Sequence, residues 1–415
     1  MIKNISLLKN IASLGALQAF NFTLTLATLP YLARTLGVFG WGSAVFVQLI
    51  VNYFIWVANW GFYLGATKRI AELRENQAKQ SRVFISTWVA QWCMTIVLLL
   101  TLVITTVTIP SFHENWELFF SASGLLIGNV LMPLWYLNGL EKIKESALIQ
   151  ITVKIVALPF IFLLVNSAED TVVYLWINSV SSILIGAMVV IWIHRSNFFD
   201  YIRPTLLDIR TAVTKDYQLF ISTIWANINS TVVPTTLGII GGEASLGYYN
   251  LADRARSAAI QVLHPITNAL FPRMCYLFTN EKTNAIRLLK LSGGFLLISS
   301  IILSLCLYFW SEEIISLLGG ASFQEGSSVL EILAFSPLFT TMSAFVIHQI
   351  VIPSGEFKMY VRSIFLTLIL SLILVYPVIT ALGVKGAAIT SISTELLTLC
   401  FLLLYIRSKN IFEKK

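Results

Sequence analysis

Charged residues, cysteine and histidine are all scarce in this chain, and each shortage excludes a class of protein. Charged side chains make up 12% of the 415 residues and apolar ones 57%, with a mean hydropathy of +0.79. Soluble domains carry about twice that charged share, so an ordinary soluble fold is excluded. The four cysteines lie far apart in the sequence and the four histidines are scattered. Neither a disulfide framework nor a metal site is therefore predicted.

Motifs for nucleotide hydrolysis and for metalloprotease chemistry are also missing. The chain has no G-x-x-x-x-G-K-[ST] phosphate loop, no H-E-x-x-H pair and no evident nucleophile with a neighbouring base. No polar stretch is long enough to fold as a catalytic domain outside the apolar segments. The sequence therefore predicts a protein that is not an enzyme and that needs no cofactor.

Long apolar runs are what the chain has in abundance. About twelve of them have the roughly 20-residue length that crosses the hydrocarbon core of a bilayer. Runs this long and continuous are helices rather than barrel strands, so we predict an all-α integral membrane protein. The expected transmembrane helices cover residues 10–32, 41–65, 84–108, 118–138, 147–166, 171–193, 217–240, 247–272, 290–310, 328–352, 361–382 and 386–406.

The placement of Lys and Arg orients these helices. If the loops alternate between two sides, 23 of the 28 cationic residues lie on one side, and such residues are retained on the cytoplasmic face. Both termini are then cytoplasmic. The net charge of +7 comes from this basic inner face, which suits anionic lipid. It is no sign of a nucleic-acid partner.

The longest inner loop, His194 to Asp216, divides the helices into two sets of six. It predicts an N-terminal lobe of residues 1–200 and a C-terminal lobe of residues 201–415. Across this boundary, Thr35-Leu36-Gly37 after the first helix is matched by Thr236-Leu237-Gly238 at the end of the seventh, and a glycine-rich turn follows both. The match indicates a parallel repeat of six helices, with chance as the alternative because Leu and Gly are common here.

The eighth helix is the least apolar of the twelve. Asp253, Arg256 and His264 follow one another at spacings that keep them within one helical stripe. Charges inside a bilayer are costly and usually functional, so these three are candidate substrate-binding residues. The alternatives are an Asp253–Arg256 pair that only neutralises two charges, or an arginine that snorkels to the interface. Arg254 points almost oppositely to Arg256.

Two further charges lie within predicted helices. Lys154 in the fifth either faces a cavity or snorkels to the cytoplasm. Glu395 in the twelfth is either a protonatable coupling group, as Asp253 also is, or a residue of helix packing. Polar stripes on the first, second, seventh and eighth helices, with Asn52 and Asn229 among them, indicate a wet central cavity shared by both halves. For any one of these residues taken alone, a hydrogen bond that bridges two helices is the favoured interpretation.

Several motifs, taken in order, resemble those of one family. Residues 30–37, Pro-Tyr-Leu-Ala-Arg-Thr-Leu-Gly, resemble the signature at the first outer loop of bacterial O-antigen flippases. These form the polysaccharide-transporter family of the multidrug/oligosaccharidyl-lipid/polysaccharide exporter superfamily. Gly61-Phe62, Gly247-Tyr248-Tyr249-Asn250, Phe271-Pro272-Arg273 and Gly386-Ala387-Ala388 resemble later motifs of that family. The similarity covers essentially the whole length.

The resemblance implies two six-helix lobes around a central cavity. It also implies movement of undecaprenyl-diphosphate-linked O-antigen repeat units from the cytoplasmic to the periplasmic leaflet of a bacterial inner membrane, as a step of lipopolysaccharide biosynthesis. Arg34, Lys154 and Arg256 match basic residues of the family and carry over as substrate-binding candidates. Asn59 departs from the pattern, because relatives often have an acidic residue there. Membrane lipids, a polysaccharide polymerase and a chain-length regulator are the expected partners.

Two other functions stay open. An ion-coupled multidrug exporter of the same superfamily would share the architecture, although a net-positive interior suits cationic drugs poorly. A polytopic O-antigen polymerase or ligase needs a sizeable outer loop that bears catalytic groups, whereas the outer loops here are short and acidic.

Overall fold

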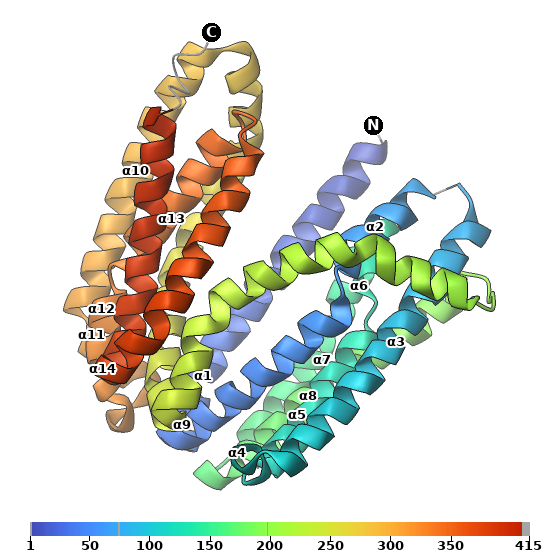
Figure 1. Cartoon of the computed structure of the whole chain (residues 1–415), viewed down its shortest axis with the longest axis horizontal. Helices are drawn as coiled ribbons and strands as arrows, with labels where there is room; N and C mark the ends of the chain where they lie inside the picture. The colour runs from blue at the N-terminus through green and yellow to red at the C-terminus, as the bar shows by residue number, and fades with distance from the viewer. Residues whose placement is uncertain (1, 74, 197, 409–415) are drawn as a thin grey trace. The chain divides into compact units, whose positions relative to one another are not determined.

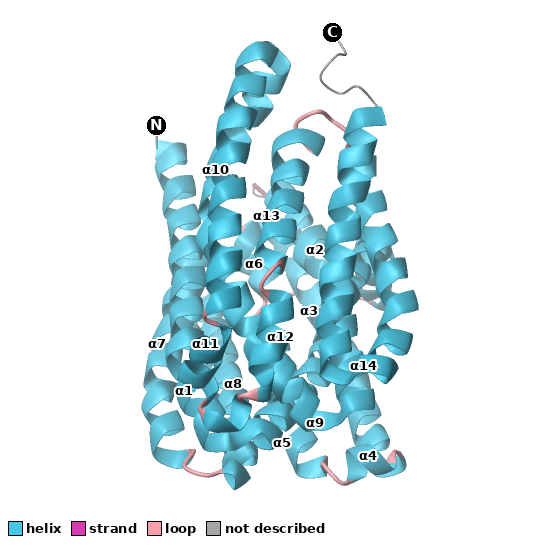
Figure 2. Ribbon diagram, turned by 90° about the vertical axis from the view of Figure 1, so that its left-hand side faces the viewer, coloured by secondary structure: helices cyan, strands magenta, loops and turns pink. Residues whose placement is uncertain are grey.

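The computed structural model describes residues 2–73, 75–196 and 198–408, and every regular element in this part of the chain is a helix (Figure 2). For residues 2–19 and some single positions, among them Asn21, His264 and Asn268, only the backbone is described. The helices are α1 Ile2–Asn59, α2 Phe62–Glu72, α3 Gln77–Thr108, α4 Pro110–His113, α5 Trp116–Leu131, α6 Leu134–Gly139, α7 Ile143–Leu164, α8 Thr171–Arg195, α9 Leu206–Asn280, α10 Lys282–Phe309, α11 Ser311–Gly319, α12 Glu325–Leu333, α13 Ser336–Val346 and α14 Phe357–Ser408, with short turns η1 Ala168–Asp170, η2 Ala321–Phe323 and η3 Ile347–Val351.

Three of these helices are each bent into two by one glycine. Gly37 in α1, Gly242 in α9 and Gly383 in α14 have φ of 66°, 76° and 58°, a region that only glycine enters at no steric cost. Each bend falls where the sequence predicts an outer loop. Counting two spans in each bent helix, the described residues contain twelve, and the predicted number is confirmed. Eight stretches qualify as spans by length and apolar composition alone.

The bent helix α9 is absent from those eight stretches. Its second half carries three charged side chains close together, Asp253, Arg254 and Arg256. Helix α3 shows the opposite composition, because a row of large apolar side chains on it stays exposed in the isolated chain, including Val97, Leu100 and Val107. Such a row is the surface that a bilayer covers.

The first compact unit comprises Met1–Leu36 and Ser43–Asn227. In it α5, α7 and α8 lie side by side (Figure 1). Glycines bring α5 and α8 together, because a Cβ added to Gly128 would overlap Ser182 and one added to Gly186 would overlap Leu131. Small residues allow this close approach, which gives membrane helices their packing contacts. A buried core cluster of this unit includes side chains of α2, α3 and α6, among them Phe62, Phe84, Trp135, Tyr136 and Leu137.

The second compact unit comprises Gly37–Gly42 and Ile228–Lys415. Two of the bends meet in it reciprocally. A Cβ on Gly42 would overlap the carbonyl oxygen of Glu243, and one on Gly247 would lie 2.5 Å from that of Val38. The two bends have nearly the same dihedral angles and are each followed by the packing glycine after the same number of residues. The structural equivalence therefore pairs Gly37 with Gly242 rather than with Gly238.

The compact units do not follow the chain halves residue for residue. The start of α9, up to Asn227, packs within the first unit, and the short segment Gly37–Gly42 packs within the second. The division into lobes of residues 1–200 and 201–415 stays a prediction. The tenth predicted helix, 328–352, is interrupted in the structure: α12 ends at Leu333, Ser336-Pro337 begins α13, and a wider turn, η3, follows.

Candidate functional site

A charged cluster lies inside the second unit, where α9, α13 and α14 meet. The guanidinium of Arg256 contacts Asp253 Oδ1 at 2.7 Å through Nη2 and Glu395 Oε1 at 2.9 Å through Nη1. Nη1 also donates to Ser336 Oγ at 2.8 Å. The side chain of Arg256 is only 15% exposed. One cation thus lies between two carboxylates. When both carboxylates are ionised, the three groups together carry a net charge of −1.

Neutral hydroxyls complete this cluster. Ser336 Oγ, which accepts from Arg256, donates to Glu395 Oε2 at 2.5 Å and lies 3.3 Å from the hydroxyl of Thr340. The hydroxyls of Tyr249 and Ser391 are 2.8 Å apart on the neighbouring turns of α9 and α14. Because burying a charge costs free energy unless it is paired and hydrogen-bonded, these partners explain how three ionisable groups are held here.

One donor of the cluster is left over. In the described part of the chain, Nε of Arg256 is buried and has no hydrogen-bond partner. The Oδ1 atom of Asn229, on α9, is likewise buried without a partner among the described residues. Buried polar atoms are normally satisfied, so an orphaned arginine donor is the position at which an acceptor from water or from a ligand is expected.

The sequence prediction brought Arg256 and Asp253 together, and the structure adds Glu395 as the second carboxylate. It places the other candidates elsewhere. Arg34 is exposed on α1 and Asn52 is exposed on the same helix beyond the bend. Lys154 is half-buried on α7 of the first unit. The side chain of His264 lies outside those that the structure describes.

Arg254 serves a different purpose from Arg256, as its opposite helical direction predicts. Its guanidinium carbon lies 5.5 Å from the centre of the Trp41 ring, and Nε donates to Asn250 Oδ1 at 3.2 Å. A cation over an aromatic face is attracted by the ring quadrupole. Arg254 is thus accommodated by its neighbours without a carboxylate.

Sequence reasoning missed Ser336 and Ser391, because serines in apolar helices are common and usually bond their own backbone. A usable signal was present at Ser336, which precedes Pro337 in the middle of a predicted span. Proline inside a transmembrane helix interrupts the backbone hydrogen bonds there. Such interruptions often mark binding sites in transporters.

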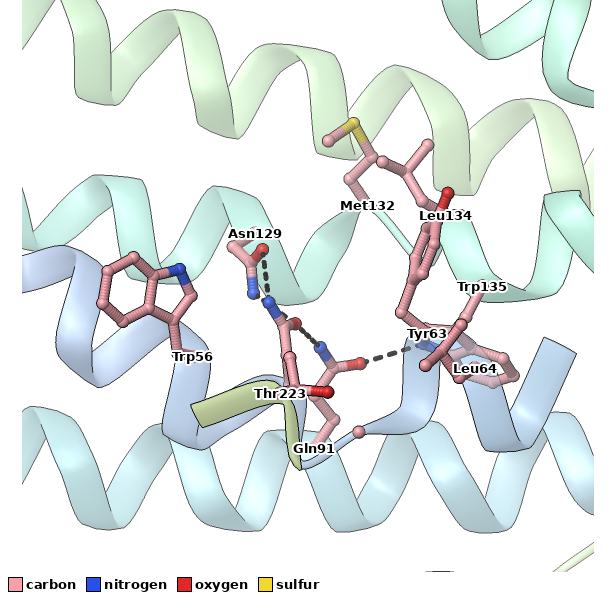
Figure 3. A pocket seen from close by; sticks show the side chains of 11 residues that line it. Trp56, Tyr63, Leu64, Gln91, Asn129, Met132, Leu134, Trp135 and Thr223 are labelled. Carbon is pink, nitrogen blue, oxygen red and sulfur yellow. Dashed lines mark hydrogen bonds between the residues drawn. The ribbon is translucent and has the colours of Figure 1, made fainter. Parts of the chain in front are cut away.

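A second polar site lies in the first unit, and Figure 3 shows its side chains. Asn59 Oδ1 accepts from Asn129 Nδ2 at 3.0 Å and from Gln91 Nε2 at 2.9 Å. Gln91 Oε1 accepts from the indole N–H of Trp135 at 3.2 Å. These groups line a pocket of about 290 Å³. Of them, the sequence singled out Asn59 alone.

The sequence of the chain resembles those of known proteins from one family. Residues 7–278 match a family described as polysaccharide biosynthesis protein. The chain is 27% identical to an Escherichia coli (strain K12) protein named provisionally as an O-antigen transporter, over 98% of each chain. A Shigella dysenteriae protein of the same name is 22% identical over 95% of this chain and 98% of its own.

Solved structures show the same fold at low sequence identity. The lipid II flippase MurJ in an inward closed conformation is 16% identical, with a TM-score of 0.73 over 96% of this chain and 88% of MurJ. An inward-facing multidrug resistance MATE family transporter of the MOP superfamily is 14% identical, with a TM-score of 0.68 over 93% and 94% of the two chains. The prediction of an all-helical membrane transporter rather than an enzyme is confirmed. Because the family match spans more than half of its residues, the chain belongs to the polysaccharide biosynthesis protein family.

Proposed function

We propose that the protein flips undecaprenyl-diphosphate-linked O-antigen repeat units from the cytoplasmic to the periplasmic leaflet of a bacterial inner membrane, by alternating access of a central cavity. The names of the two relatives support the substrate class. The observation that carries the proposal is the buried cluster around Arg256. A diphosphate headgroup cannot cross hydrocarbon unaided, and a shielded arginine holds its oxygens by charge-assisted hydrogen bonds.

The geometry of Arg256 sharpens how it would bind the diphosphate. Both terminal nitrogens are occupied by carboxylates, so an incoming anion meets Asp253 and Glu395 as competitors. Nε is the donor left without a partner in the described part of the chain. In the proposal Lys154 and Arg34 supply further positive charge to the substrate. Asn52, Asn229 and His264 bond sugar hydroxyls, and the orphaned Oδ1 of Asn229 suits a hydroxyl donor.

The two carboxylates give the proposal its coupling step. When one of Asp253 or Glu395 takes up a proton, the cluster becomes neutral and one side of the guanidinium loses its charged partner. That side then binds a diphosphate oxygen. When the proton leaves, the carboxylate competes again for Arg256 and displaces the anion. Proton movement and substrate release are thereby linked through the same guanidinium.

Complementation tests the site. In a strain that lacks its own O-antigen flippase, Arg256→Ala should abolish O-antigen display on a lipopolysaccharide gel, with normal protein level on an immunoblot. Arg254→Ala is the matched control, because it removes a cation two residues away that contacts Trp41 and Asn250 and pairs with no carboxylate among the described residues. It should retain display. Normal display by Arg256→Ala would refute the site assignment.

A second pair of measurements addresses the coupling and the rival function. Glu395→Gln should transport at a reduced rate that no longer responds to dissipation of the proton gradient, whereas the parent chain should respond. Drug susceptibility separates a flippase from a multidrug exporter, and expression of this protein should leave it unchanged. Broad resistance without O-antigen display would favour the exporter.

Membrane orientation and partners complete the proposal. A multi-pass protein with twelve spans has both termini on one side, and the basic inner loops favour the cytoplasm. Downstream, a polysaccharide polymerase and a chain-length regulator would consume the flipped repeat units. Reporter fusions at Lys415 that are active only in the cytoplasm would support this orientation, and activity in the periplasm would contradict it.

A further inference from the structure

The pocket of the first unit lies where two membrane helices break. Helix α1 ends at Asn59, and the next two residues, Trp60 and Gly61, have positive φ of 41° and 74°. Helix α5 ends at Leu131, and the chain passes through Met132 and Pro133 before α6 begins. Gly61 and Met132 both line the pocket. Irregular backbone at membrane depth is tolerated only where it is buried in protein or lines a cavity, and broken helices mark substrate sites in transporters.

The lining of this pocket is polar but carries no charge. Its polar side chains are those of Asn59, Gln91, Asn129, Thr223 and the aromatic residues, and no Asp, Glu, Lys or Arg is among the lining residues. A diphosphate would lack a cation here, and a metal ion or a proton would lack a carboxylate. Burying an unpaired charge is costly. The chemistry that fits is therefore an uncharged, hydrogen-bonding ligand.

The three amides have hydrogen-bonding capacity to spare. Each amide offers two N–H donors and two acceptor positions on its oxygen. Asn59 Oδ1 is fully used by Asn129 and Gln91, whereas Asn59 Nδ2 makes only a long 3.5 Å contact with Asn129 Oδ1. Among the described residues, each of the three amide nitrogens keeps one N–H without a partner. The network thus fixes the orientation of the amides and leaves donors for a ligand.

Aromatic side chains supply the rest of the site. The nitrogen edge of the Trp56 ring is turned toward Asn129 (Figure 3), and no hydrogen bond of Trp56 is found in the described part of the chain. Tyr63 adds a phenolic hydroxyl to the lining. Trp and Tyr combine an apolar ring face with a polar handle. A pyranose matches this combination, because its ring presents C–H faces and its rim presents hydroxyls.

The size agrees with a small ligand. A pocket of about 290 Å³ lies just below the ~300–1,000 Å³ range of sites for larger, drug-sized ligands. We infer that this pocket is a subsite for one uncharged pyranose ring, with hydroxyl or acetamido substituents, of the lipid-linked glycan. The inference rests on the proposed function for the identity of that glycan. It adds a neutral sugar subsite in the first unit to the charged cluster that the second unit contains.

Saturation-transfer NMR on the full-length protein in lipid nanodiscs tests the subsite directly. The probes are the neutral methyl α-glucoside and its acidic counterpart methyl α-glucuronide, which differ only at C6. The neutral probe should receive saturation from the parent protein and the acidic probe should not. Asn129→Leu should abolish the transfer. Trp56→Phe is the milder variant, which keeps an aromatic ring and removes the N–H. It should weaken binding about five-fold, the effect of losing one ordinary hydrogen bond.

Controls make failure of this inference distinguishable from failure of the proposed function. Asn178→Leu removes an amide that bonds its own helix at Tyr174, and it should bind the probe as the parent does. Arg256→Ala should also keep probe binding while it loses O-antigen display. Unchanged probe binding by both Asn129→Leu and Trp56→Phe, or equal binding of the acidic probe, overturns the subsite. Probe binding that follows the expected pattern in a protein that never supports display upholds the subsite and overturns the proposed function.

Discussion

Replacing Asp216 by alanine should detach the start of α9 from the rest of the first unit. Asp216 is 1% exposed and holds Arg69 of α2 through two parallel bonds of 2.5 and 2.8 Å. A Cβ on Gly65 would overlap this carboxylate, so the glycine makes room for the pair. Close by, the indole of Trp60 stacks on Phe220 at 4.0 Å and donates to the carbonyl of Val213 at 3.0 Å. The ion pair and the stack together anchor residues 213–220.

The magnitude follows from the burial of the pair. Asp216→Ala leaves the largely buried guanidinium of Arg69 without its partner, which costs about 3–5 kcal/mol for a buried pair. Asp208 is the control on the same helix. It pairs with Arg82 at 3.0 Å, but the side chain of Arg82 is 54% exposed, and exposed pairs contribute only about 0–1 kcal/mol. The double variant Arg69→Met/Asp216→Leu should recover most of the loss, because it leaves no buried charge unpaired.

Hydrogen exchange of the purified protein in nanodiscs measures the effect locally. Amides of residues 206–220 should exchange on the order of 100-fold faster in Asp216→Ala, since ~1.4 kcal/mol corresponds to ten-fold and part of the cost falls on other elements. Asp208→Ala should change the same amides less than ten-fold. The reasoning is refuted if the two variants exchange alike, or if the double variant is no better protected than Asp216→Ala.

Three further outcomes are expected. Hydrogen bonds from the Thr205 hydroxyl and amide, aided by Arg82, hold the pKa of Asp208 below its usual value. The stability that ionised Asp208 contributes is therefore present above the ordinary carboxyl pKa of about 3.9 and is lost as the pH falls through the lowered pKa. Hydrogen-exchange protection of residues 205–210 should drop below pH 4 in the parent chain and show no such step in Asp208→Asn. Gly42→Ala puts a methyl group onto the Glu243 carbonyl and should cost about 1–3 kcal/mol by overpacking, seen as a lower midpoint of thermal unfolding in detergent, whereas Gly294→Ala, with open space around it, should raise or keep the midpoint. Ser336→Ala removes a hydroxyl shared by Arg256 and Glu395 and should lower the free energy of unfolding by about 1–3 kcal/mol. The loss should be smaller in a Glu395→Gln background, and equal losses in both backgrounds would show that the serine acts independently of Glu395.

Sequence patterns predicted the membrane helices because hydropathy and length are local properties. The twelve spans follow from them, and the bends at Gly37, Gly242 and Gly383 fall where short outer loops were expected. Within one helix, the three-residue spacing of Asp253 and Arg256 also predicted their contact. Hydropathy does not register where a helix breaks in its interior. The interruptions at Trp60-Gly61 and at Met132-Pro133 therefore went unpredicted, together with the pocket that they form.

Contacts between distant segments were the other limit. Glu395 reaches Arg256 across 139 residues, and Gln91 reaches Asn59 across 32. A single sequence contains no signal that pairs such positions, because each residue alone reads as an isolated polar group in an apolar helix. The sequence left open whether Glu395 is a coupling group or a residue of helix packing. In the structure Glu395 of α14 pairs with Arg256 of α9, and its coupling role stays a prediction.

The residue at position 59 bears on which of the two sites couples transport to protons. The family resemblance implies an acidic residue at this position, where this chain has Asn59. The surrounding pocket has no titratable carboxylate or amine in its lining. A proton taken up there would have no carboxylate to hold it. In the described residues of the second unit, by contrast, two carboxylates share one arginine. If Asn59→Asp introduced a second titrating position, transport by that variant should acquire a new pH dependence without loss of the one that Glu395 provides. If Glu395→Gln alone leaves transport and its pH dependence unchanged, the coupling group lies outside both sites.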